Sequence, residues 1–478
     1  MSSVSALNSL LSSADPSSSI DLSSILEAAM GASSPGLDVT SAVNSAVTAA
    51  EAPEQAWESQ ETTLQNQISA LTTIQTDATN LDNDMQSLNS ITGPLSARTV
   101  SSSNSNVLSA SAASGTTMGN HVVVVNSLAT TASWTSATFA SGSTALPAGN
   151  FTITAGSGAT ATVTTDGTTT LSDVASQINS DNLGLSASVV TDATGSRLAI
   201  ISNASGSAAN FSISSSDPTG FGFTQAVTGA NAALTVDGIS ISSASNTVAG
   251  AVPGLTLNLL SADPGVQVSL GVAPDTSQAS TAINQFVTDY NAAIQALNSQ
   301  FTFSSSTSSE GPLASDTVVR NLQNELMQAV DYTAAPASGT TTTTIPNLSS
   351  LGITVNDDGT LSVDSGTLNA TLTNNFSDVQ NFFQGSSLNG FANTLDQQLT
   401  SYLAPGDGAF TVDLSSMNSE ITDLQTDVTN FQTNYIAPLQ TQLQSDYSQA
   451  EIDLQELPNE IKQIDTELGE NNSSSSGG

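Results

Sequence analysis

An apolar stripe with helical spacing lies near each end of the chain, and no helix can bury such a stripe alone. In residues 52–91 large apolar side chains recur mostly every three or four positions. Pro53 suits the first turn of this helix, and Gly93-Pro94 ends it. The stripe is close to a heptad pattern, so it predicts a long helix packed against a partner. Its members are Trp57, Leu64, Ile68, Leu71, Ile74, Ala78, Leu81, Met85 and Leu88.

The C-terminal part of the chain supplies a matching pattern. Apolar residues step by four and three from Met417 to Tyr435, are interrupted at Pro438, and resume from Leu439 to Leu468 with a stutter at the start. Pro458 lies inside the resumed run and should kink it. A further helical pattern spans Ile283 to Leu297. We expect the C-terminal helices to pair with the helix of residues 52–91 and cover its stripe.

The sequence between the helical ends is typical of β-structure. Short runs of β-branched and aromatic residues are separated by Gly, Asp, Asn and Pro. Asp166-Gly167 and Asp237-Gly238 are predicted hairpin turns, and a short helix is expected over residues 170–180. The strand-like runs are residues 121–125, 151–154, 161–165, 186–190, 197–201, 211–214, 233–236, 255–260 and 266–272.

Helices at both ends and strands between them predict a nested fold. The fold class is α+β, multidomain and elongated: an antiparallel coiled-coil helical stalk from both chain ends, with nested β-rich head domains. The predicted parts are a flexible N-terminal segment (1–50, with short helices around 22–30 and 39–49), a stalk helix (51–96), a β-rich head (97–130 and 229–276), an inserted β-rich domain (131–228), a helical or mixed stalk domain (277–435), and a C-terminal leg helix and tail (436–478).

Charge excludes several classes of partner. Four Lys and Arg stand against 42 Asp and Glu, a net charge of −38. Such a chain repels phosphate backbones and anionic lipid surfaces, so we expect no nucleic acid and no membrane insertion. There is no Cys, which excludes disulfides and thiol chemistry. The composition resembles that of a secreted or surface protein, yet the first residues lack the basic and apolar regions of a secretory signal.

Candidate catalytic and metal sites are weak. His121, the single histidine, opens an apolar strand and is read as structural. Asn356-Asp357-Asp358-Gly359 lacks the ligand spacing of a calcium loop and reads as a hairpin tip. No pair of carboxylates stands out beside an aromatic sugar-binding cleft. We therefore predict no enzyme activity, no catalytic residues, no cofactor and no metal.

Several blocks of the chain together form a recognisable ordered set. Residues 34–71 contain a G-L-D opening, a Pro-containing helix start and a Q-I-S-A-L helix. Residues 119–141 contain a strand-like run followed by L-A and a Phe-Ala-Ser turn, and residues 170–214 contain an I-N motif. The other blocks are residues 234–260, 286–297, 311–326 and 351–364. In this order the blocks resemble the flagellar filament cap protein family, also called flagellar hook-associated protein 2, and the I-N motif is similar to that of flagellins and hook-associated proteins.

The resemblance implies a structural protein at the distal tip of the bacterial flagellum. Its family forms a small homo-oligomeric ring whose β domains make a plate and whose helical legs reach into the growing filament. Exported flagellin subunits fold and insert beneath the plate. The resemblance therefore implies that the protein is required for filament elongation and hence for motility. The implied partners are other copies of the chain, flagellin, the hook–filament junction and a dedicated export chaperone. Export by the flagellar type III system would explain the missing signal, and the resemblance also implies a role in cell adhesion.

The C-terminal seam is the predicted contact surface of the leg. Its acidic flank reads as a solvated face, and burial of the apolar seam stabilises more than like charges cost. The predicted oligomer or filament contacts are Leu439, Leu443, Tyr447, Leu454, Leu457, Ile461 and Ile464. The alternative is that they only pack within their own chain, onto Leu64, Leu71 and their neighbours.

Two other functions are compatible with the sequence. The I-N motif also permits a flagellin or a junction protein of the hook-associated protein 3 type. A surface adhesin or a glycan-active enzyme on a β-rich scaffold is the third alternative.

Overall fold

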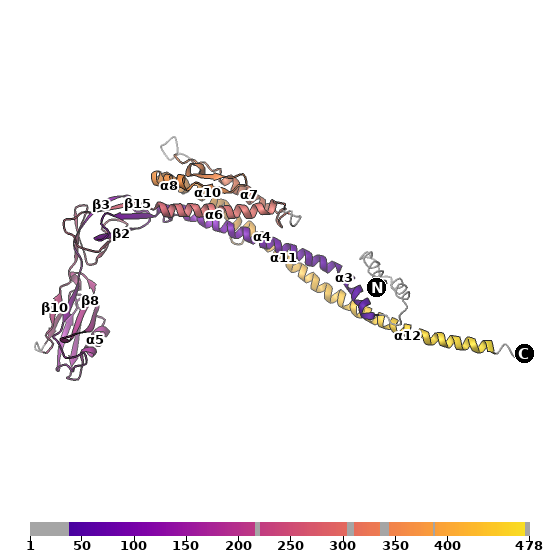
Figure 1. Ribbon diagram of the computed structural model, residues 1–478, viewed down its shortest axis with the longest axis horizontal. Helices are drawn as coiled ribbons and strands as arrows, with labels where there is room; N and C mark the ends of the chain where they lie inside the picture. The colour runs from indigo at the N-terminus through magenta and orange to yellow at the C-terminus, as the bar shows by residue number, and fades with distance from the viewer. Residues whose placement is uncertain (1–37, 216–219, 304–309, 335–343, 386–387, 474–478) are drawn as a thin grey trace.

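The computed structural model describes residues 38–215, 220–303, 310–334, 344–385 and 388–473. The molecule is elongated, with strands at one end and long helices running to the other (Figure 1). Mixed helix and several separate sheets agree with the predicted α+β class. The helix expected around residues 22–30 lies outside the described residues, as do the rest of segment 1–37 and the end of the tail.

The long helices form where the apolar stripes predicted them. α4 extends over Ala52–Asn89, with Pro53 in its first turn, and α6 extends over Thr276–Phe301. α3 (Val39–Ala50) precedes α4, and Asp38 caps it by accepting from the Ser41 amide. The remaining helices are α5 (Leu171–Ser180), α7 (Thr317–Ala329), α8 (Ser365–Asn374), α9 (Phe376–Gln384), α10 (Phe391–Leu403), α11 (Ala409–Phe431) and α12 (Ala437–Ser473), with short turns η1 (Pro94–Ser96), η2 (Ser207–Ala209) and η3 (Leu348–Leu351) and the π-helical turn η4 (Gln432–Ile436).

The strands form several sheets. A five-stranded sheet has the order β1-β15-β3-β11-β12, a four-stranded sheet β10-β4-β8-β7, and three-stranded sheets β13-β14-β2 and β6-β5-β9. The strands are β1 (Arg98–Ser102), β2 (Leu108–Ala112), β3 (Gly119–Ser127), β4 (Thr131–Thr135), β5 (Gly149–Thr154), β6 (Thr160–Thr165), β7 (Leu185–Asp192), β8 (Gly195–Ser205), β9 (Ser212–Ser215), β10 (Thr224–Val227), β11 (Ala232–Val236), β12 (Ile239–Ser243), β13 (Thr247–Ala249), β14 (Leu255–Leu259), β15 (Val268–Pro274), β16 (Ile353–Val355) and β17 (Leu361–Val363).

Strand pairing shows how the middle of the chain leaves and returns. β1, which follows the first long helix, pairs antiparallel with β15, which leads into α6, with Arg98 opposite Pro274. Further along, β4 pairs with β10, and Thr135 lies opposite Thr224. We call the part from β4 to β10, including α5, the outer head. The inner head comprises β1 to β3 and β11 to β15, and it lies between the outer head and the helices (Figure 1).

The two predicted hairpin turns differ in outcome. Asp237 and Gly238 have φ values of 51° and 83° and join β11 to β12, as predicted. The prediction at Asp166-Gly167 was wrong, because this turn leads from β6 into α5. The Asp166 carboxylate accepts bonds from the amides and hydroxyls of Thr168 and Thr169, so the turn is built by side-chain capping and not by strand pairing.

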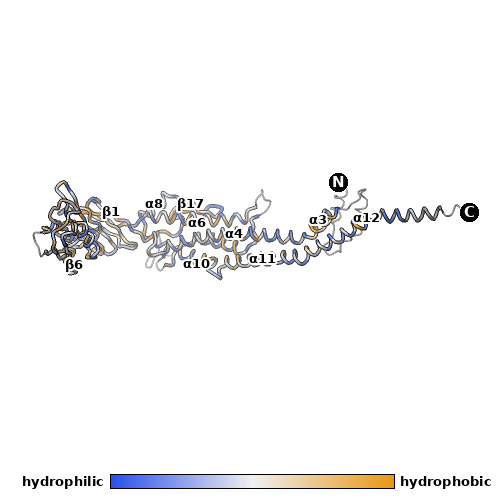
Figure 2. Tube along the Cα trace, turned by 90° about the horizontal axis from the view of Figure 1, so that it is seen from below, coloured by the Kyte–Doolittle hydropathy of each residue, from blue (hydrophilic) through white to orange (hydrophobic). Residues whose placement is uncertain are grey.

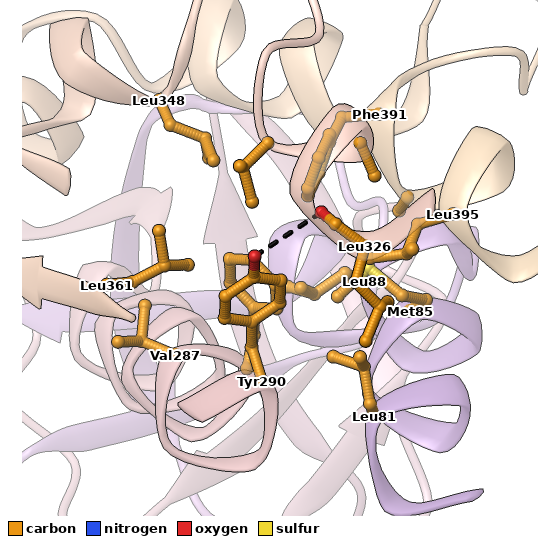
Figure 3. Packing of buried hydrophobic residues seen from close by; sticks show 14 of the residues in the cluster. Leu81, Met85, Leu88, Val287, Tyr290, Leu326, Leu348, Leu361, Phe391 and Leu395 are labelled. Carbon is orange, nitrogen blue, oxygen red and sulfur yellow. Dashed lines mark hydrogen bonds between the residues drawn. The ribbon is translucent and has the colours of Figure 1, made fainter. Parts of the chain in front are cut away.

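The largest core lies where α4, α6 and α10 meet, and α7, α8 and α9 cover it. Met85 and Leu88 of α4 are fully buried there. Tyr290 of α6 is equally buried, and its hydroxyl donates to the carbonyl of Leu326 at 3.3 Å (Figure 3). This bond satisfies the one polar atom that the ring carries into the core. We call this helical assembly the helical body.

Candidate functional site: an assembly surface on the terminal helices

An apolar cluster joins α3 to the start of α12, far from the heads (Figure 1). Val43, Ala46 and Val47 of α3 lie on the face turned toward α12. They pack against Ile436, Leu443 and Tyr447, which are between 3% and 5% exposed. We call these six residues the terminal cluster. Because α3 contacts α4 much less, this N-terminal helix is held mainly by the C-terminal helix.

The structure places the predicted contact residues in two groups. Leu443 and Tyr447 are buried under α3, and Leu439 packs partly against the same cluster. Beyond α3 the seam emerges: Leu454 is half-buried and Leu457 is 43% exposed. The side chains of Ile461 and Ile464 lie outside the described ones. Leu454 and Leu457 are therefore the members of the predicted set that the described chain leaves accessible, and the role of all seven in assembly stays a prediction.

The helix continues through Pro438, where the sequence predicted an interruption. A π-helical turn, η4, joins α11 to α12 directly before this proline. Proline has no N–H to donate and its ring collides with the carbonyl of the preceding turn, and a wider turn relieves both problems. The interruption of the apolar pattern therefore does not end the helix, and the stutter lies where η4 joins α12.

Polar contacts link α4 to α11 along their exposed sides. Gln60 donates to Glu420 at 2.7 Å, and Gln425 donates to Glu61 at 2.7 Å. Gln432 also donates to Glu54. The start of α4 thus contacts the residue that follows α11, and positions further along α4 contact earlier positions of α11. The two helices are therefore antiparallel. In a chain with so few cations, glutamine amides are the donors to these carboxylates.

Hydropathy along α12 differs between the part that α3 covers and the part beyond it (Figure 2). Apolar segments appear where α3 meets α12, and the described tube of α12 becomes hydrophilic toward its end. Trp57 of α4 and Phe431 of α11 make an edge-to-face ring contact, with centroids 5.4 Å apart. The apolar contacts of the long helices are thus concentrated at a few points and separated by polar stretches.

Carboxyl groups from different helices meet beside the core of the helical body. Burial, then the neighbouring Asp289 of α6, raises the pKa of Asp84 to about 7. Burial and Asp396 of α10 raise the pKa of Asp82 to about 6. Asp82 Oδ1 and Asp84 Oδ2 are buried without a hydrogen-bond partner among the described residues. When the Asp84–Asp289 pair and the Asp82–Asp396 pair each hold one proton, the two carboxyl groups of a pair no longer repel each other.

We expect the helical body to lose stability as the pH rises from about 4 to about 7. The pKa values of Asp82 and Asp84 are about 6 and about 7 in the folded chain, against an ordinary carboxyl value of 3.8. The folded state therefore binds more protons than the unfolded state between these pH values, and the free energy of unfolding falls as Asp82 and Asp84 lose them. Thermal unfolding followed by circular dichroism at a series of pH values measures this.

Asp84→Asn should raise the Tm near neutral pH and flatten its pH dependence. Asp427→Asn removes the same charge from an exposed site on α11 and serves as the control. If Asp84→Asn lowers the Tm at neutral pH, or matches the control across the whole series, the shared-proton explanation is wrong.

The other sequence candidates hold the backbone in place. His121 Nδ1 lies 2.8 Å from Asp237 Oδ2, and Asp237 Oδ1 accepts from the Val122 amide, so this pair ties the β11–β12 turn to β3. Residues 356–359 form the tip of the β16–β17 hairpin, where Asp358 accepts from Thr360. Within the described ranges, no three His, Asp or Glu side chains gather as a metal site would require. Among the same residues, no helix combines the length and apolarity needed to cross a bilayer.

Two family models, one for the N-terminus and one for the C-terminus of the same protein family, match successive parts of this chain. The model of the flagellar hook-associated protein 2 N-terminus matches residues 35–132, and that of its C-terminus matches residues 229–457. The chain belongs to the flagellar hook-associated protein 2 family. Between the two matches, residues 150–204 fit the flagellin hook IN motif, which lies in the outer head. The predicted family resemblance is confirmed.

Individual relatives of the hook-associated protein 2 family show the same relationship. The B-type flagellar hook-associated protein 2 of Pseudomonas aeruginosa is 28% identical over 337 residues, 64% of this chain and 69% of that protein. The flagellar hook-associated protein 2 of Escherichia coli K12 is 28% identical over 257 residues, 49% of this chain and 53% of that protein. The crystal structure of the D1-D2-D3 domains of the flagellar cap protein FliD from Escherichia coli aligns with a TM-score of 0.58 at 26% identity, covering 73% of this chain and 99% of that one.

Proposed function

We propose that this protein is the structural cap at the distal tip of the bacterial flagellar filament. There it guides exported flagellin subunits as they fold and insert, and filament elongation requires it. The observation that carries the proposal is the ordered match of both family models, supported by the similarity of the fold to a flagellar cap protein. The role is mechanical and involves no covalent chemistry.

The proposed division of labour follows the predicted parts of the chain. Residues 97–130 and 229–276, with the insertion 131–228, form the plate. Residues 51–96 and 277–435 form a stalk in which α4 and α11 pair as an antiparallel coiled coil, supported by the Gln60–Glu420 and Trp57–Phe431 contacts. Residues 1–50 and 436–478 form the leg. A leg with few apolar contacts binds weakly enough to release one site at a time.

The proposed partners are other copies of the chain in a small ring, flagellin, and the hook–filament junction. We also propose export through the flagellar type III channel with the help of a dedicated chaperone. The absence of cysteine suits passage through a narrow pore, because a disulfide would close a loop in the threaded chain. The site of action is then outside the cell, at the filament tip.

Electron microscopy of the purified full chain tests the proposal. We expect closed rings of a few copies with the strand-built heads together and the helices projecting. Long self-assembled filaments would instead assign the chain to the flagellins or junction proteins, with which it shares the I-N motif. A second arm adds the protein to growing filaments that lack a cap and measures their length. Failure to restore growth contradicts the proposal.

A further inference from the structure

Among the described residues, the outward face of the four-stranded sheet in the outer head is left exposed. In β7 and β8 the side chains alternate, with Leu185, Ala187, Leu198 and Ile200 buried in the core of the outer head. α5 packs against this sheet from the core side. The opposite side chains of the same strands face away from that core.

The strand register brings the outward side chains into rows. Ile201 lies opposite Ser186 of β7 on one side and Ser133 of β4 on the other, and Val227 of β10 continues the row. Val190 lies opposite Arg197 in a second row. Val190, Ile201 and Val227 are 55%, 41% and 45% exposed. We call this surface the outer sheet face.

The charge of the outer sheet face contrasts with that of the whole chain. Besides Arg197 and Asn203, its outward strand positions carry hydroxyl, small or apolar side chains, and Asp192 lies only at its rim. The Asp192 carboxylate is engaged in its own turn by the amide and hydroxyl of Thr194. In a chain of net charge −38, copies repel one another over most surfaces. A face with no carboxylate at its centre is where they can approach.

Arg197 distinguishes this face from an ordinary exposed sheet. Arg98 donates to the carbonyls of Ala97 and Thr116, and Arg320 donates to the carbonyl of Ala314 and stacks over Phe301. For Arg197, no guanidinium hydrogen bond to another described residue is present, although Asp192 lies near enough to interact through charge. An exposed guanidinium amid apolar side chains offers a bidentate site for a carboxylate.

We propose that the outer sheet face binds an acidic surface of a second copy of this chain. The contact is heterologous, because the face carries Arg197 and has no carboxylate at its centre, so the acidic surface that it binds is a different part of the second copy. Heterologous contacts close into rings when the rotation between copies allows it. The inference rests on the proposed function and names the surface by which the heads join around the ring.

The test measures ring formation of the full chain by mass photometry over a concentration series. Ile201→Glu and Arg197→Glu each put a carboxylate on the face, and we expect each to raise the dissociation constant roughly tenfold or more. Arg197→Lys keeps the charge and should weaken the ring less. Ile239→Glu adds the same charge at a more exposed isoleucine of β12, outside the face, and is the matched control. Circular dichroism checks that every variant is folded.

The outcomes separate this inference from the function on which it rests. If the wild-type chain forms closed rings and Ile201→Glu assembles like Ile239→Glu, the outer sheet face is not the contact, whereas the cap function stands. If the rings are unchanged but added flagellin no longer binds the Arg197→Glu variant, the face belongs to flagellin and the inference is overturned. A wild-type chain that stays monomeric throughout rejects the ring and the inference together.

Discussion

Phe391→Ala should lower the free energy of unfolding of the helical body by about 3–5 kcal/mol. Phe391 is 1% exposed at the start of α10. Its ring stacks on Phe382, with centroids 5.5 Å apart, and meets Phe286 edge-on at 5.6 Å. Truncation removes apolar burial and leaves a cavity between rings that other helices hold in place, so the site cannot collapse around the gap.

Urea unfolding followed by far-ultraviolet circular dichroism measures this loss, because the helical body holds most of the helix. Phe303→Ala makes the same change at a side chain that is 63% exposed, and its effect should stay within about 0.5 kcal/mol. Equal effects of the two substitutions would show that the aromatic group around Phe391 does not hold the helical body together.

Deletion of residues 436–478 is expected to abolish filament growth while leaving the heads and the helical body folded. The deletion removes α12 with Leu443 and Tyr447, and with them the main support of α3. The core of the helical body is built from elements that end before this segment, so its packing is retained. Filament length on cells that express only the truncated chain is the measurement.

Two further variants separate contact from folding. Deletion of residues 474–478 shortens the tail beyond α12 and should leave filament growth unchanged. The double substitution Leu454→Ser, Leu457→Ser alters the accessible part of the seam and leaves the terminal cluster intact, and it should shorten filaments strongly. Normal filaments from the chain lacking 436–478 would falsify the leg hypothesis. A normal double variant would restrict the contact to α3 and the terminal cluster.

The long-range plan of the fold could be predicted from the sequence because it depends on periodicity. The stripe from Leu64 to Leu88 required a partner helix, and α6, α10 and α11 supply it. The strand runs and the Asp237-Gly238 turn were also readable. The helices α7 to α10 escaped residue-level prediction, because each is too short, at 9 to 13 residues, to repeat its apolar pattern over many turns.

The candidate assembly surface on the terminal helices was less accessible to prediction. The seam on α12 was visible, and the helix around residues 39–49 was predicted, but no pattern told which helix α3 would cover. Val43 and Val47 are too few for a heptad match, so only the tertiary packing shows that they hide Leu443 and Tyr447. The Asp84–Asp289 pair is equally silent in sequence, because its members come from separate helices and each alone resembles a solvated acid.

The nested strand pairing has a consequence for the order in which the chain acquires structure. The outer head is one continuous stretch between β4 and β10, so it can condense as soon as that stretch is available. α4 precedes it, yet the helices that cover α4 begin at Thr276, after it. Pairing across such a separation is slow. When the N-terminus of the chain emerges first, α4 is present before the helices that cover it. The polar side chains of α4 must therefore keep this segment in solution until those helices have emerged.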